Sequence, residues 1–272
     1  MDTPTQATDL GELTFDEFRK RFSTGESVNG QPITTNKPVY LVPNEAPISR
    51  GFEAVDDLLD RITSVSPDPK LNFYGIIGGV DLTLSYIAEI WSRLGRLPVD
   101  GEAIVLTDIN HTALDYLRYR LNIFRGASNL QQYLEILEIE EPKIAIKMKE
   151  YSEKLSPEDR EKLWFNDESR FRLLKNMVEA GSIKAFQSDY YGKGQDVIVN
   201  SAERTSPNGA VLYLSDIAGV SPLRSPAAKH KGNDRIVPAL QKRQIPFVII
   251  ENGMSGNYKS ISSLPRVSYA QN

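Results

Sequence analysis

The chain alternates between short, continuous apolar runs and stretches with helical spacing of apolar residues. The continuous runs predict five buried strands, at residues 72–77, 102–110, 182–189, 210–219 and 245–253. Between them, apolar residues recur every three or four positions, which predicts helices at 82–95, 112–126, 194–209 and 236–244. Strands that alternate with helices in this way predict an α/β fold with a doubly wound, mostly parallel sheet.

Helical spacing also marks the segments around this core. Residues 12–22 and 51–65 each place apolar residues on one face, so we expect residues 1–70 to form an N-terminal cap on a domain spanning 71–272. A long charged stretch, residues 130–180, predicts a helical excursion over the sheet. Within it, residues 141–165 are expected to be too polar for a core. Whether the excursion carries substrate specificity or is a solvated arm is left open.

Composition narrows the chemistry. The 272 residues include no cysteine, which excludes disulfides, thiolate metal sites and a cysteine nucleophile. Only two histidines occur, His111 and His230, so no metal centre is expected. The net charge of −4 argues against a nucleic-acid partner. The N-terminus lacks an apolar signal core and the chain has no run of eighteen apolar residues, so we expect a cytoplasmic protein without a membrane partner.

The residues that follow the predicted strands are rich in glycine, acids and hydroxyls. In a doubly wound sheet the ligand lies across the carboxyl ends of the strands, near the point where the strand order reverses. The candidates are Gly78, Gly79 and Asp81 after the first strand, Asp108, Ile109 and Asn110 after the second, Ser188, Asp189 and Tyr190 after the third, and Ser215 and Asp216 after the fourth.

These residue types suit a nucleoside. Glycines let the backbone approach a ligand closely. Asp108 can accept hydrogen bonds from both ribose hydroxyls, and Asp189 can accept one from an adenine amine. The alternative for Asp108 is an N-cap of the following helix. Because several strand ends agree, the pattern favours nucleoside binding.

The first of these turns, in "LNFYGIIGGVDLT", lacks the G-x-G-x-x-G spacing of a dinucleotide site. Gly79 and Asp108 are also 29 residues apart, more than the ~20 of the dinucleotide pattern. A nucleoside without a pyrophosphate, S-adenosylmethionine, therefore fits better.

Four segments, "GVDLTLSYI", "TDIN", "RFRLLKNMVEAGSIKAFQSD" and "YLSDI", carry a resemblance to a known group. Over about residues 70–255 the chain resembles the class I S-adenosylmethionine-dependent fold, and within it the 3-amino-3-carboxypropyl transferases of the betaine-lipid-synthase type. It is also similar in size and type to azetidine-2-carboxylate synthases. The resemblance implies a Rossmann-like methyltransferase fold and S-adenosylmethionine as substrate. It further implies attack on the γ-carbon of that substrate with release of methylthioadenosine, either by cyclisation to azetidine-2-carboxylate or by transfer to a small acceptor.

Under the hypothesis of attack on the γ-carbon, five residues are candidates for catalysis. Tyr190 and Tyr191 can present aromatic faces to the sulfonium, or can simply pack. Ser215 and Asp216 lie where the substrate amine should fall, and Asn200 could fix that amine from the preceding helix. A carboxylate raises the pKa of a nearby ammonium, so Asp216 would position the amine rather than deprotonate it.

Three alternatives stay open. They are a small-molecule methyltransferase, a nicotinamide-dependent oxidoreductase, which the glycine spacing disfavours, and a nucleoside-binding regulator without catalysis. In each case the expected partner is a small molecule, and a homodimer is left open.

Overall fold

The computed structural model describes residue 43 and residues 48–77, 79–108, 111–187, 193–205, 207–215 and 235–251. Five strands form a single sheet in the order β3-β2-β1-β4-β5, and every pair of neighbours is parallel. The sheet confirms the predicted α/β class and the predicted strands to within a few residues. The strands are β1 (Leu71–Ile76), β2 (Ala103–Asp108), β3 (Ile183–Gln187), β4 (Gly209–Ser215) and β5 (Phe247–Glu251).

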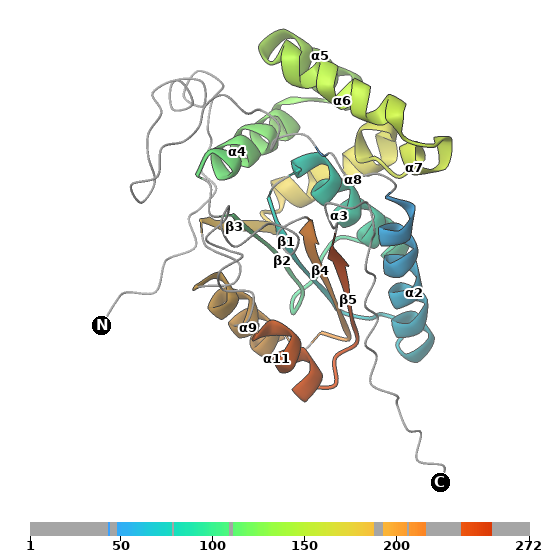
Figure 1. The fold of residues 1–272 in the computed structure, drawn as a ribbon, viewed down its shortest axis with the longest axis vertical. Coiled ribbons are helices and arrows are strands. Elements are labelled where there is room, and N and C mark those ends of the chain that lie inside the picture. The colour runs from blue at the N-terminus through green and yellow to red at the C-terminus, as the bar shows by residue number, and fades with distance from the viewer. Residues whose placement is uncertain are drawn as a thin grey trace, which may run out of the picture.

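Helices cover both faces of the sheet (Figure 1). One face carries α2 (Ser49–Val65), α3 (Val80–Leu94) and α4 (His111–Gly126), and the other carries α9 (Lys193–Thr205) and α11 (Ile236–Lys242). The chain adds β2 and β3 on one side of β1 and then β4 and β5 on the other, so right-handed crossovers place the connecting helices on opposite faces. Every residue of β1 is buried, as its continuous apolar run predicts.

The apolar faces predicted for two of these helices are confirmed. The apolar residues that recur every three or four positions along α4 are all buried, namely Leu114, Leu117, Leu121 and Phe124. The helix α2 buries its apolar face against α3, β4 and β5. The predicted boundary at residue 70 falls in the turn between α2 and β1, and the helix predicted at 12–22 lies outside the described residues.

Glycine ends α3 as the sequence predicts. Gly95 follows the helix in the left-handed conformation, with φ of 66°, and its backbone N–H donates to the carbonyl of Ser92.

The charged stretch 130–180 is helical, as predicted, but it is not confined to the surface. It contains α5 (Leu130–Glu140), α6 (Pro142–Lys154), α7 (Pro157–Glu161), the 3₁₀ turn η2 (Trp164–Asn166) and α8 (Glu168–Glu179). The helix α8 packs on α3 and α4 as an outer layer.

The prediction that residues 141–165 are too polar for a core is wrong at their C-terminal end. Trp164 is fully buried, and its ring centroid lies 4.9 Å from that of Phe124 and 5.1 Å from that of Tyr133. One short turn therefore anchors the helical stretch in the core, because an indole buries more apolar surface than most side chains.

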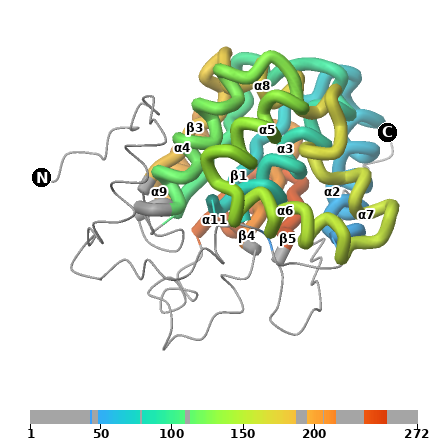
Figure 2. Tube along the Cα trace, turned by 90° about the horizontal axis from the view of Figure 1, so that it is seen from above, coloured from blue at the N-terminus to red at the C-terminus, as the bar shows by residue number. Residues whose placement is uncertain are grey.

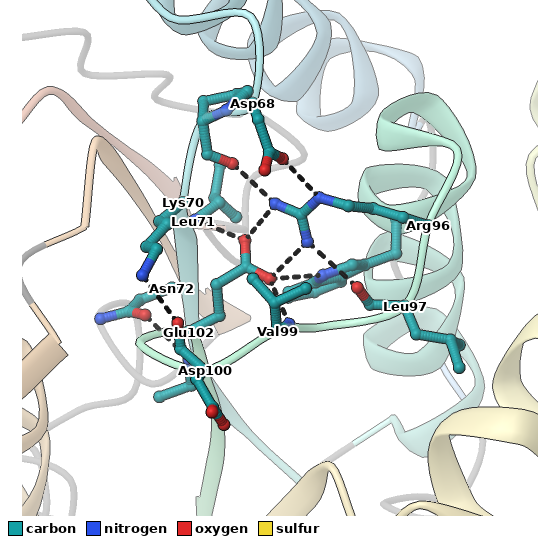
Figure 3. A network of polar contacts seen from close by, with 12 residues as sticks. Asp68, Lys70, Leu71, Asn72, Arg96, Leu97, Val99, Asp100 and Glu102 are labelled. Atoms are coloured by element: carbon teal, nitrogen blue, oxygen red, sulfur yellow. Dashed lines mark hydrogen bonds and ion pairs between the residues drawn. The ribbon is translucent and has the colours of Figure 1, made fainter.

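A buried carboxylate fixes the amino-terminal edge of the sheet (Figure 3). The Glu102 side chain has no exposed surface and accepts hydrogen bonds from the backbone N–H groups of Leu71, at 2.8 Å, and Val99, at 2.9 Å. Arg96 pairs with the same carboxylate at 2.7 and 3.0 Å, and it reaches Asp68 at 2.9 Å. These contacts join the start of β1 to the turn before β2, at the edge opposite the predicted site.

Candidate active site

The strand order places a topological switch point at the carboxyl ends of β1 and β4. The connections from these two neighbouring strands leave towards opposite faces of the sheet, which is the condition for a topological switch point. The strand ends that precede the predicted site residues, Ile76, Asp108, Gln187 and Ser215, all lie at this edge because the strands are parallel. The topology thus places the ends of these strands, including Asp108 and Ser215, at one edge of the sheet.

The turn from β1 into α3 depends on a glycine. Gly79 is buried, has a φ of 70° and caps the N-terminus of α3. A side chain there would be strained by the positive φ, and its Cβ would lie 3.5 Å from the Cα of Pro43. The hydroxyl of Thr83 donates to the carbonyl of Ile76 at 3.1 Å and ties the first turn of α3 to the end of β1. The backbone at this turn is therefore fixed.

Asp108 ends β2 beside this turn. It is half-buried, and its neighbour Thr107 is paired in register with Ile76, the last residue of β1. The helix α4 begins at His111, so Asp108 belongs to the strand and does not immediately precede the helix as an N-cap would.

Thr107 is fully buried, and its hydroxyl has no hydrogen-bond partner among the described residues. Its carbonyl accepts from the backbone N–H of Ile77 at 3.2 Å, which extends the β1–β2 pairing into the turn. The backbone next to Asp108 is thus held by the sheet.

Asp81 occupies a different place from the one expected of a cofactor ligand. Its carboxylate is fully buried, and Arg120 Nη2 lies 2.6 Å from Asp81 Oδ1. The carboxylate therefore joins the first turn of α3 to α4, within a packed interior. The cofactor role predicted for Asp81 gains no support from this position.

Arg120 is a buried charged residue that the sequence analysis did not identify. It is fully buried, donates to the hydroxyl of Tyr116 at 2.6 Å and also donates to the hydroxyl of Tyr133. Its guanidinium lies over the rings of Tyr116 and Tyr133, at 5.4 Å from each centroid, and of Trp164, at 5.9 Å. A cation is thus enclosed by one carboxylate and three aromatic rings.

Asp81 and Arg120 each stabilise the charged form of the other. Burial raises the pKa of Asp81 above its usual value, and Arg120 counteracts that rise. Burial opposes the charge on Arg120, but Asp81 and the neighbouring tyrosines hold the pKa of the guanidinium well above its usual value. Arg120 therefore stays charged inside the protein.

The structure does not bring Asn200 to the predicted site. Asn200 is exposed on α9, seven residues beyond the start of that helix at Lys193, which is about 10 Å along its axis. The far end of α9 reaches the opposite edge of the sheet, where Thr205 Oγ1 lies 2.6 Å from Asn72 Nδ2.

Of the remaining candidates, Ser215 is the last described residue of β4, and the others lie outside the described residues. The backbone of Ser215 ends β4, in register with Glu251 of β5. Outside the described residues are Gly78, Ile109, Asn110, Ser188, Asp189, Tyr190, Tyr191 and Asp216.

Within the described ranges, no group of three or more His, Asp or Glu side chains is arranged to hold a metal ion. No helix in the same ranges is long and apolar enough to cross a membrane.

Comparisons with known proteins do not indicate which reaction this protein catalyses or which ligand it binds. The strand order is one on which many activities are built, so the fold does not select among them. No protein-family model, curated protein or solved structure matches this chain.

Proposed function

We propose that this protein is an S-adenosylmethionine-dependent enzyme of the class I methyltransferase type of Rossmann-like fold. It uses the 3-amino-3-carboxypropyl arm of its substrate and releases methylthioadenosine. The product is azetidine-2-carboxylate when the substrate's own amine attacks, or an aminocarboxypropylated small acceptor when another nucleophile does.

One observation carries the nucleoside part of this proposal. Asp108, half-buried at the end of β2, lies beside a β1–α3 turn whose backbone is shaped by Gly79. A carboxylate here can accept two hydrogen bonds from the ribose hydroxyls, while the turn lets the backbone approach the nucleoside.

The choice of cofactor rests on what the turn lacks. The sequence "GIIGGVDLT" has no G-x-G-x-x-G spacing, so it favours a ligand without a pyrophosphate. The strand order is also that of dinucleotide-binding folds, which keeps a nicotinamide cofactor as the second candidate.

The choice of reaction rests on the sequence resemblance, in particular on "YLSDI" at the end of β4. In the cyclisation, a new bond forms between the substrate nitrogen and the γ-carbon, and the bond between that carbon and sulfur breaks. The sulfur keeps the electron pair and leaves as methylthioadenosine, while the amine loses a proton to water. In this scheme Ser215 and Asp216 orient the amine, and Tyr190 and Tyr191 face the sulfonium.

Incubation of the purified protein with S-adenosylmethionine alone tests the reaction, with products separated by mass. Cyclisation predicts methylthioadenosine together with azetidine-2-carboxylate. Methylthioadenosine with homoserine or its lactone, formed faster than in buffer without protein, indicates a transferase whose acceptor is replaced by water. S-adenosylhomocysteine as the only nucleoside product, formed once an acceptor is added, would contradict γ-carbon chemistry and indicate a methyltransferase.

A further inference from the structure

The helices α5 and α6 form one outer end of the molecule, away from the sheet (Figure 1). Figure 2 looks onto this end. The helix α5 packs on α4 and α8, and α6 packs on α5. The side chains that face inward from this pair are buried; they are Tyr133 and Leu137 on α5, and Ile144, Met148 and Tyr151 on α6.

Two isoleucines on these helices point away from the core. Ile139 is 80% exposed and Ile146 is 57% exposed. Each follows a buried residue, Leu137 or Ile144, by two positions, which is a rotation of about 200° around the helix. Both side chains are therefore on the outward faces of α5 and α6.

A hollow of about 300 Å³ lies between α5, α6 and η2. Apolar atoms of Leu137, Met148 and Phe165 contribute to its lining, and Glu138 on α5 and Lys149 on α6 contribute charged groups. Ile139 directly follows Glu138 on α5. On α6, Ile146 precedes Lys149 by three positions, which places the two about 60° apart around the helix. Ile146 thus lies beside the hollow, whereas Ile139 is about 200° around α5 from Leu137 and points away from the hollow.

The two helices carry opposite charges. Among the charged residues of α5 there are only glutamates, Glu135, Glu138 and Glu140. The helix α6 carries four lysines against two glutamates. Neither Glu138 nor Lys149 forms an ion pair with any part of the chain that the structure describes.

We propose that the α5–α6 face is the interface of a two-fold homodimer. A two-fold axis pairs a surface with itself, so the surface must carry both halves of every complementary contact. This face does so, because it combines a protruding isoleucine, Ile146, with an apolar hollow and an acidic helix with a basic one. In the dimer Ile146 of each copy enters the hollow of the other, and Glu138 of each copy faces Lys149 of its partner.

Sedimentation velocity on the full chain tests this proposal, which does not depend on the proposed function. The wild type should approach twice the monomer mass as its concentration rises. Ile146→Lys should raise the dissociation constant at least about tenfold, because it places a charge in an apolar contact. Val65→Lys is the matched control, since Val65 is 79% exposed at the end of α2, and it should leave the mass unchanged. Circular dichroism verifies that each variant is folded.

Charge-reversal variants test the proposed pairing of Glu138 with Lys149 of the other copy more specifically. Glu138→Lys and Lys149→Glu should each favour the monomer, because like charges then meet at both symmetry-related contacts. An equimolar mixture of the two variants should dimerise, since each reversed charge then faces an opposite one across the interface. A wild type that stays monomeric over the accessible concentrations would overturn the proposal and leave this face to a different protein or to another segment of the chain. A dimer that the lysine and charge variants leave intact would overturn it as well.

Discussion

Gly51 lies in the first turn of α2, at a place where a side chain has no room. A Cβ built there would lie 2.1 Å from the Tyr86 hydroxyl oxygen and 3.2 Å from Ile250 Cγ2. Tyr86 itself is fully buried and stacks on Phe52, with ring centroids 4.4 Å apart. The glycine therefore allows α2 to approach a stack of aromatic rings that joins it to α3.

Gly51→Ala should lower the free energy of unfolding by about 1–3 kcal/mol, because the added methyl group overpacks this contact. Urea denaturation measures the change. Gly126→Ala is the matched control, because no atom lies within 4 Å of a Cβ there, and its effect should stay within about 0.5 kcal/mol. Tyr86→Phe in the Gly51→Ala background should recover part of the loss, since it removes the oxygen that the methyl group meets. A Gly51→Ala variant as stable as the control would contradict this packing.

At the scale of elements, the Asp81–Arg120 pair joins α3 to α4 inside the core. Breaking a buried pair leaves one charge uncompensated, which costs about 3–5 kcal/mol. Removing both charges together avoids that cost.

Asp81→Ala and Arg120→Met should each reduce stability by about that amount, and the double variant should lose less than the sum by at least about 1 kcal/mol. Chemical denaturation of all four proteins gives the cycle. Arg172→Met provides a control at an exposed pair with Glu168 on α8, and it should cost less than about 1 kcal/mol. Additive effects of Asp81→Ala and Arg120→Met would show that the pair is not coupled.

The position of Arg120 in the sequence indicates that it is buried and requires a partner. Arg120 follows Leu117 by three positions and precedes Phe124 by four, so it falls on the apolar face of α4, where a cation requires a partner. The identity of that partner could not be predicted, because Asp81 is 39 residues away and reaches Arg120 only through the packing of two helices.

Strands were easier to predict than the helical stretch 130–180, for a physical reason. A buried parallel strand is apolar at every position, so its sequence shows a continuous run. The outer helices bury only one stripe each, and η2 lies within a polar stretch although it buries Trp164 and Phe165. The burial of Trp164 is decided by aromatic neighbours from α4, α5 and α8, which local composition does not reveal.

At the scale of the whole molecule, buried tyrosines should limit stability in alkali. Burial raises the pKa of Tyr74 to about 12 and also raises the pKa values of Tyr116, Tyr119 and Tyr133. In the unfolded chain these phenols ionise near pH 10. The unfolded state therefore releases protons first, and stability that is complete below about pH 10 is lost as the pH rises towards 12.

The free energy of unfolding should fall by about 1.4 kcal/mol per pH unit for each such tyrosine above about pH 10. Urea denaturation at a series of pH values measures the slope. Tyr74→Phe should be less stable at neutral pH, since it removes the oxygen that accepts from Asn72 at 2.6 Å, but its decline in alkali should be shallower. A stability that is flat up to about pH 12, or an unchanged slope in Tyr74→Phe, would contradict the assignment.

The edge of the sheet at which Asp108 and Ser215 lie could be predicted from the sequence, whereas the side-chain contacts at that edge could not. Parallel strands bring their carboxyl ends to one edge, so Asp108 and Ser215 could be assigned to the same edge from strand order alone. Asn200 was misplaced because the position of a residue along a helix decides which edge it reaches, and α9 carries it away from the strand ends.

Calorimetric titration shows whether a nucleoside without a pyrophosphate binds beside Asp108. S-adenosylmethionine should bind more tightly than NAD. Asp108→Ala should weaken S-adenosylmethionine binding about a hundredfold or more, because it removes two hydrogen bonds to a charged group, each worth about 1.5–3 kcal/mol. Asp100→Ala, an exposed carboxylate at the opposite edge of the sheet, should bind like the wild type. Binding of NAD without S-adenosylmethionine, or an Asp108→Ala variant that keeps its affinity, would contradict the account.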